Sequence, residues 1–346
     1  MKLKKVCEQV IVITGATSGI GLTTARMAAR KGAKLVLVAR NEAALKQLAD
    51  EINSTAARAA FLAADVADES ALRRAAEIAT EQFGGFDTWV NNAGCTIYGR
   101  IAEVPIDDMR RLFETNFWGF VYGSRIAVEH LGERGGALIN VGSEVCDIAV
   151  PLQGIYTATK HAIKGFTDVL RMEVEADNLP VSVSLVKPTA IHTPIPQNAR
   201  SYLRYEPHLP PPIYAPELVA EAILYCAENS VRDFMVGDTA PIHTAIGTYT
   251  PRLYDRINEL IIDSAQNSGQ PAKPDRPDGL YQTNSKLQER GADDRLVLEQ
   301  SLYQHYKIHP LLTAGIIAGG GLAIAGLLRL RRNSAERINL PGESLS

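Results

Sequence analysis

The chain has few cysteines and few aromatic residues. Its 346 residues include four cysteines, two tryptophans and eight phenylalanines. The cysteines are widely spaced, at Cys7, Cys95, Cys146 and Cys226, and do not form the dense framework of a small disulfide-stapled secreted domain. This low cysteine content indicates a reduced, cytoplasmic protein.

The sequence also lacks a strong excess of either charge. It has 36 Lys and Arg against 39 Asp and Glu, a net charge of −3. Without a basic face, nucleic-acid binding is not expected. The seven histidines are scattered without a metal-ligand spacing, so no metal site is predicted. The cationic N-terminus has no long apolar run after it, and no signal peptide is indicated.

A glycine-rich turn near the N-terminus is the first positive signal. The β-branched run at 10–13 predicts a buried strand, and it leads into Thr14-Gly-Ala-Thr-Ser-Gly-Ile-Gly21, a helix-like stretch and a second strand. This order is the context of a dinucleotide site. Gly15 allows a tight turn, Gly19 lets the backbone approach a pyrophosphate, and Gly21 lets the helix pack closely.

A second signal lies in the middle of the chain. Tyr156 and Lys160 are four residues apart, so on a helix they share a face. A nearby ammonium group lowers the pKa of a phenol from about 10, towards the range of an acid/base catalyst. Ser143 precedes the tyrosine by thirteen residues and follows an apolar run at 137–141. A Tyr-x-x-x-Lys pair is by itself a common surface pattern, so its catalytic interpretation depends on the other motifs of the chain.

Four motifs together resemble one known family. They are Gly15-x-x-x-Gly19-x-Gly21, Asn91-Asn-Ala-Gly94, Ser143 and the Tyr156/Lys160 pair. Their order and spacing resemble the short-chain dehydrogenase/reductase family over about residues 8–240. The resemblance implies an α/β fold, a doubly wound Rossmann-type parallel sheet of about seven strands, and hydride transfer between a nicotinamide cofactor and a carbonyl or alcohol group.

The resemblance also implies a role for individual residues. Tyr156 would exchange a proton with the substrate oxygen, Ser143 would bind that oxygen, and Lys160 would lower the pKa of the tyrosine and hold the nicotinamide ribose. Asn116 would support a water chain to the lysine; a purely structural helix asparagine is the alternative. The expected cofactor-binding residues are Gly15, Thr17, Ser18, Gly19, Ile20, Gly21, Arg40, Asp65, Val66, Asn92, Ala93, Gly94, Tyr156, Lys160, Pro188 and Thr193.

The end of the second strand favours one cofactor. NAD-binding sites of this fold usually place a carboxylate there, whereas this chain has Ala39-Arg40. An arginine fork suits a 2′-phosphate, so NADP(H) is favoured over NAD(H). A solvated arginine at a strand end is the alternative interpretation.

The domain organisation follows from changes of composition. Residues 1–250 alternate strand and helix patterns, with strands expected at 10–14, 34–38, 59–63, 87–91, 137–141, 181–186 and 234–236. A proline-rich stretch at 190–215 is expected to form a substrate lid. Residues 251–310 form a polar extension, with a helix expected at 251–264.

Residues 311–332 form a hydrophobic segment with a basic flank. No charge occurs in 311–328, and Arg329-Leu-Arg-Arg332 follows. The length is at the short edge of what spans a membrane, so the segment is a candidate membrane anchor for a cytoplasmic enzyme domain. A buried or dimer-packing helix is the alternative. A single span would place that domain and the arginines on opposite sides, which a shallow interfacial position would avoid.

The sequence therefore predicts an NADP(H)-dependent oxidoreductase acting on a small carbonyl or alcohol substrate, with an apolar substrate suggested by the hydrophobic C-terminus. The alternatives are a non-catalytic NADP(H)-binding regulatory protein tethered to a membrane, and a related epimerase or dehydratase. Assembly as a homodimer or homotetramer is left open.

Overall fold

A seven-stranded parallel sheet forms the centre of the structure, a computed structural model that describes residues 2–283, 286–292 and 295–309. The strand order is β11-β7-β6-β4-β1-β2-β3. The strands are β1 (Val10–Thr14), β2 (Lys34–Ala39), β3 (Arg58–Ala63), β4 (Thr88–Asn91), β6 (Gly136–Val141), β7 (Val181–Pro188) and β11 (Asp233–Val236). Each strand coincides with a predicted segment to within two residues, and the doubly wound α/β fold is confirmed.

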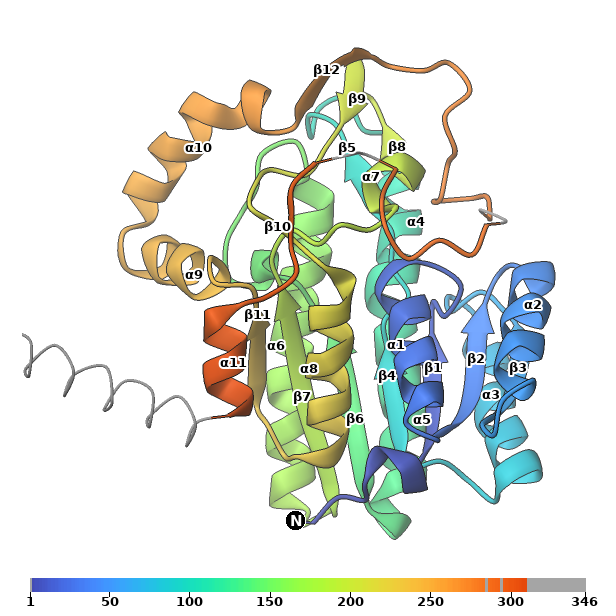
Figure 1. The fold of residues 1–346 in the computed structure, drawn as a ribbon. Coiled ribbons are helices and arrows are strands. Elements are labelled where there is room, and N and C mark those ends of the chain that lie inside the picture. Colours follow the sequence, from blue (N-terminus) through green and yellow to red (C-terminus); the bar gives the residue numbers. More distant parts are fainter. Residues whose placement is uncertain (1, 284–285, 293–294, 310–346) are drawn as a thin grey trace, which may run out of the picture. The chain divides into compact units, whose positions relative to one another are not determined.

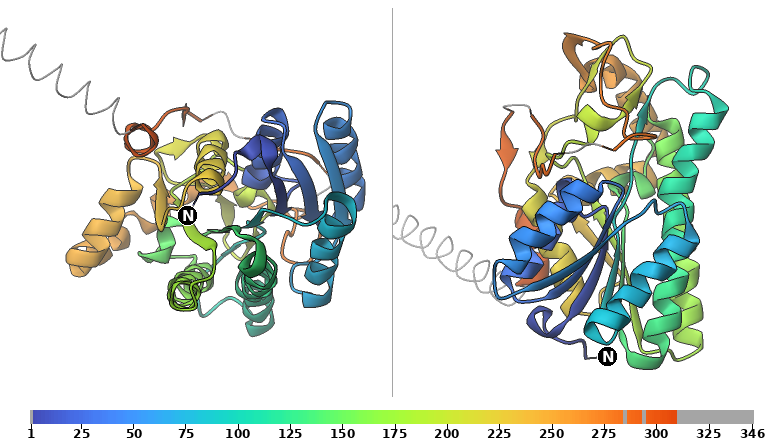
Figure 2. Two further views of the ribbon diagram at one scale, coloured as in Figure 1. Left: turned by 90° about the horizontal axis from the view of Figure 1, so that it is seen from below. Right: turned by 90° about the vertical axis from the view of Figure 1, so that its right-hand side faces the viewer.

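Helices cover both faces of the sheet (Figures 1 and 2). One face carries α1 (Gly19–Arg30), α2 (Glu42–Asn53) and α8 (Pro216–Glu228). The other carries α3 (Glu69–Phe83), α5 (Gly119–Arg134) and α6 (Gly154–Ala176). Trp89 and other apolar side chains of the central strands are fully buried beneath these layers. Burial on both faces explains why the strands are continuous apolar runs rather than alternating ones.

One helix on the second face is locally irregular. α4 (Ile106–Phe113) continues through a π-helical turn, Glu114–Trp118, directly into α5. Such a turn is often found at functional sites, because it rotates the side chains that follow it. Here it contains Asn116, which is fully buried.

The carboxyl ends of the strands are covered by short elements from distant parts of the chain (Figure 1). The expected lid contains α7 (Ile195–Asn198), β8 (Arg200–Ser201), β9 (Tyr205–Pro207) and β10 (Ile213–Tyr214). It pairs with β5 (Ile97–Tyr98), with β12 (Asn267–Pro271) and with β13 (Val297–Leu298). α9 (Ala240–Tyr249) and α10 (Pro251–Ala265) lie between the sheet and β12 in sequence, and α10 is where a helix was predicted.

The compact unit that contains the sheet runs from Met1 to Ser301. It therefore extends well past residue 250, where the composition changes, and includes most of the polar extension. The second unit, Leu302–Ser346, contains α11 (Leu302–Ile308). Among the described residues, no helix combines the length and apolar character needed to cross a membrane. The hydrophobic segment at 311–328 lies outside the described residues.

Candidate active site

The glycine turn joins β1 to α1 in the predicted way. Gly15 and Gly19 have positive φ angles of +68° and +51°, which side chains with a Cβ rarely adopt. A Cβ on Gly21 would lie 2.2 Å from the Gly15 carbonyl oxygen, so only glycine permits this approach of helix to turn. Asn92, which follows the neighbouring strand β4, stabilises the turn, because its Nδ2 donates to the Thr14 carbonyl oxygen at 2.9 Å.

Ser143, Tyr156 and Lys160 meet at the carboxyl end of β6. Ser143 follows β6, and the other two residues lie in the first two turns of α6. Ser143 lies close enough to the Tyr156 phenol to influence its pKa. Lys160 Nζ lies 5.7 Å from the centre of the Tyr156 ring and donates to the Val141 carbonyl oxygen at 3.0 Å. The three predicted catalytic side chains are thus neighbours in space.

Burial dominates the electrostatics of this group. It raises the pKa of the Tyr156 phenol well above its ordinary value, although the Ser143 hydroxyl lowers that pKa. Burial lowers the pKa of the Lys160 ammonium to about 8, because the buried side chain has lost its water. The direction for tyrosine is opposite to the depression expected from the sequence. The penalty for burying a phenolate exceeds the stabilisation that the Ser143 hydroxyl gives it.

Asn116 connects the loop after β4 with α6 through hydrogen bonds of its side chain. Its Oδ1 accepts from the Cys95 amide at 3.0 Å, and its Nδ2 donates to the Cys95 carbonyl at 2.9 Å and to Thr159 Oγ1 at 3.2 Å. It thereby fixes the loop after β4 against α6. The side chain does not line the cavity, so the structure gives it a positioning contact rather than direct access to a substrate.

Arg40 and Asp65 also line the cavity, and both have partners in distant parts of the chain. The Arg40 guanidinium donates to the carbonyl oxygens of Gly279, Leu280 and Gln282. Asp65 accepts from Arg111 and from the Ala67 amide. Asp65 and Arg111 are 46 residues apart in the sequence, so no local pattern predicts that they form a pair.

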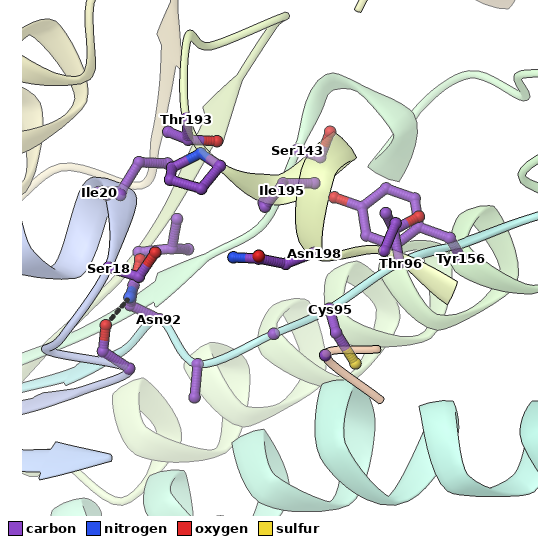
Figure 3. A pocket seen from close by; sticks show the side chains of 18 of the residues that line it. Ser18, Ile20, Asn92, Cys95, Thr96, Ser143, Tyr156, Thr193, Ile195 and Asn198 are labelled. Atoms are coloured by element: carbon purple, nitrogen blue, oxygen red, sulfur yellow. Dashed lines mark hydrogen bonds between the residues drawn. The ribbon is translucent and has the colours of Figure 1, made fainter. Parts of the chain in front are cut away.

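One cavity connects these groups (Figure 3). In Figure 3, Ser143 and Tyr156 lie at one end and Ser18, Ile20 and Asn92 at the other. Of the predicted site residues, Gly21 and Asn116 lie behind the wall, and the following ones line the cavity: Gly15, Thr17, Ser18, Gly19, Ile20, Arg40, Asp65, Val66, Asn92, Ala93, Gly94, Ser143, Tyr156, Lys160, Pro188 and Thr193.

Several lining residues near Tyr156 escaped prediction. They come from the segment after β4, the segment between β6 and α6, and the lid: Thr96, Tyr98, Val145, Val150, Gln153, Ile195, Asn198 and Pro210. Most are apolar, and the Gln153 side chain is held by the Thr96 hydroxyl at 3.2 Å. No motif marks these positions, because only the fold brings the three segments together.

The chain is similar to known proteins over this whole region. Residues 9–203 match the family model described as short chain dehydrogenase. An uncharacterized oxidoreductase, YxnA of Bacillus subtilis, is 46% identical over 322 residues, which are 92% of this chain and 90% of the relative. Dehydrogenase/reductase SDR family member 7B of Bos taurus is 32% identical, covering 72% of this chain and 79% of the relative.

A solved structure is similar in fold as well. It is an alcohol dehydrogenase from the archaeon Thermococcus sibiricus, complexed with 5-hydroxy-NADP. The TM-score is 0.57 at 26% sequence identity, and the match covers 66% of this chain and 95% of that chain. With its doubly wound sheet, its glycine turn and these relatives, the chain belongs to the short-chain dehydrogenase/reductase family.

Proposed function

We propose that this oxidoreductase interconverts a carbonyl and an alcohol with NADP(H), using Tyr156 as the general acid and base. The observation that carries the proposal is the contact of Ser143 with Tyr156 beside Lys160, in the same cavity as the glycine turn. A hydroxyl pair at one end and phosphate-binding groups at the other fit a substrate oxygen and a dinucleotide respectively.

The donor set at the nucleotide end fits a dinucleotide carrying a 2′-phosphate. Gly19 opens α1, so its N–H group has no acceptor within the helix, and the N–H group and the helix dipole together favour an anion. Arg40 ends the second strand, where a 2′-phosphate would be held. The alcohol dehydrogenase from Thermococcus sibiricus is complexed with an NADP derivative, which is consistent with this assignment.

The chain's own residues would then divide the chemistry. The cofactor supplies the hydride donor or acceptor. The Ser143 hydroxyl positions the substrate oxygen, and the Tyr156 hydroxyl gives that oxygen a proton or takes one from it. The Lys160 ammonium favours the phenolate through its charge, while Asn116 keeps Thr159 and the Cys95 loop in place. The apolar walls exclude water and suit an apolar substrate.

Tyr156→Phe tests the proposal because it removes only the hydroxyl. In a screen of NADPH consumption against aldehydes, ketones, quinones, retinoids and steroids, we expect wild-type turnover that the variant loses by at least about 100-fold. NADPH binding, followed by fluorescence titration, should be preserved in the variant and should be tighter than NADH binding in the wild type. Substantial turnover by Tyr156→Phe contradicts the mechanism, and tighter NADH binding contradicts the cofactor. A protein that binds NADPH but turns over nothing would favour the regulatory alternative.

A further inference from the structure

The backbone of the polar extension occupies the phosphate-binding end of the glycine turn. The Gly19 amide donates to the Gln288 carbonyl oxygen at 2.9 Å, and Ser18 forms a backbone bridge with Gln288. This amide stands at the N-terminus of α1, where a pyrophosphate oxygen would accept the same proton. One N–H group cannot serve both oxygens fully, so the extension and a dinucleotide compete for it.

The same extension occupies Arg40. The carbonyl oxygens of Gly279, Leu280 and Gln282 lie 2.6, 3.2 and 3.0 Å from the guanidinium nitrogens. These contacts use three of the five N–H donors that an arginine carries. Three oxygens around one guanidinium are also what a phosphate group would present. The backbone therefore imitates the anion at both positions where NADP(H) carries phosphate.

These contacts belong to a built structure, which we call the strap: residues 278–283 and 286–291. The Leu280 side chain is fully buried against Ile97, Val104 and Leu112. Further along, Glu289 pairs with Arg26 of α1 at 2.9 Å. Arg290 pairs with Glu217 at 2.9 Å and with Glu299 at 2.6 Å. A buried side chain and several ion pairs therefore hold the strap against the sheet domain, with its carbonyl oxygens directed at Gly19 and Arg40.

We propose that the strap is an intramolecular competitor of NADP(H), which must be displaced from Gly19 and Arg40 before the cofactor's phosphates can take their places. This inference rests on the proposed function. The apparent dissociation constant is then the intrinsic one divided by the fraction of molecules with a displaced strap. Any change that weakens the strap without touching the phosphate-binding groups strengthens cofactor binding.

Glu289→Gln is the sharpest test, because it removes one strap charge and leaves the phosphate-binding groups intact. Glu51→Gln is its matched control: Glu51 binds the same Arg26, at 2.7 Å, but lies outside the strap. We expect NADPH to bind about threefold more tightly to Glu289→Gln and not more tightly to Glu51→Gln, measured by fluorescence titration. Leu280→Ala should increase the affinity for NADPH about tenfold or more, because the strap loses the apolar contacts of the Leu280 side chain.

Hydrogen exchange gives an independent readout in the wild type. Displacement by NADPH should make the amides of 279–283 and 286–291 exchange faster, whereas a strap that closes over the cofactor would make them exchange slower. Slower exchange, or weaker NADPH binding by both strap variants, overturns the proposal. Failure of the proposed function looks different: neither the wild type nor the strap-weakened variants would bind NADP(H) at all.

Discussion

The charge of the buried Lys160 opposes folding. Its ammonium is 5% exposed and lies 5.2 Å from the centre of the Phe120 ring, with the Val141 carbonyl as a hydrogen-bond acceptor. Burial still lowers its pKa to about 8, from 10.5. Burying the charge therefore costs more free energy than these contacts contribute, so the proposed catalytic role, rather than stability, accounts for a lysine at this position.

Lys160→Met should accordingly raise the free energy of unfolding at pH 7 by about 1–3 kcal/mol, while it abolishes turnover and weakens NADPH binding. Since the pKa is lower in the folded state, the cost of the charge is fully present below pH 8. It fades as the pH rises from about 8 to 10.5, where the folded lysine loses its proton first. The stability gap between variant and wild type should shrink over that range in urea titrations.

Lys164→Met, one turn further along α6, is the control. Its ammonium is 37% exposed and pairs with Asp168 at 3.2 Å, so its removal should not stabilise the protein. A Lys160→Met variant no more stable than wild type at pH 7 would refute the argument.

Single residues also show where sequence patterns stop being informative. Gly15, Gly19 and Gly21 could be assigned because their roles depend on the local backbone. The direction of the Tyr156 pKa could not, because it depends on how deeply the fold buries the phenol. The partners of Arg40 could not be predicted either, because they are backbone carbonyl groups, which every residue type has.

Among the elements, the lid and the strap are joined by a charged cluster around Asp108 of α4. This carboxylate is 5% exposed and accepts from the hydroxyls of Tyr202 and Tyr281, while Arg200 pairs with it at 2.5 Å. Burial opposes its ionisation, but these donors outweigh burial and lower the pKa of Asp108. Its stabilising contribution is therefore present at neutral pH and is lost only as the carboxylate protonates in acid.

Asp108→Ala should destabilise the protein by about 1–3 kcal/mol, because two phenols lose their acceptor and Arg200 loses one of its two carboxylate partners, the other being Asp278. If turnover is detected, the Michaelis constant should rise more than the turnover number falls, since the lid loses its support. Asp107→Ala is the matched control: its carboxylate is 88% exposed, and its pair with Arg110 is a surface contact. Equal effects of the two substitutions in urea unfolding would disprove the role of the cluster.

Some secondary-structure elements could be predicted from the sequence, and others could not. The seven strands could be placed because apolar, β-branched runs and turn residues mark them locally. The pairing of β12 with β9 and of β13 with β10 could not, because two- to five-residue strands in polar segments carry no periodic signal. Leu209 and Pro210, which line the cavity, lie in one of these irregular segments, between β9 and β10.

For the whole molecule, the compact unit predicts where the chain can be shortened. A chain ending at Ser301 keeps the unit intact and should retain the melting temperature and NADPH affinity of the full-length protein. A chain ending at residue 250 uncovers the Leu280 socket and deprives Asp108 of Tyr281. It should lose at least about 3 kcal/mol of stability. Equal stability of the two shortened chains would place the domain boundary at 250 instead.

The same pair of proteins, full-length and ending at Ser301, tests the hydrophobic segment at 311–328. We expect the full-length chain to sediment with membranes and to resist a high-salt wash, because an uncharged segment attaches through apolar contacts. The chain ending at Ser301 should stay in the supernatant. Full-length protein that remains in the supernatant without detergent would favour a packing helix over an anchor.

The strap follows the sheet and Lys160 in the chain, and this order has a consequence for biosynthesis. A ribosome makes the glycine turn, the sheet and Lys160 before it makes Gln288. A nascent chain that folds as it emerges would thus meet NADP(H) before its internal competitor exists. Protein translated with the cofactor present should carry it from the start, whereas protein translated without it should acquire it only at the rate of strap opening. The measurement is the fraction of protein that carries the cofactor, compared between NADPH added before translation and NADPH added after it.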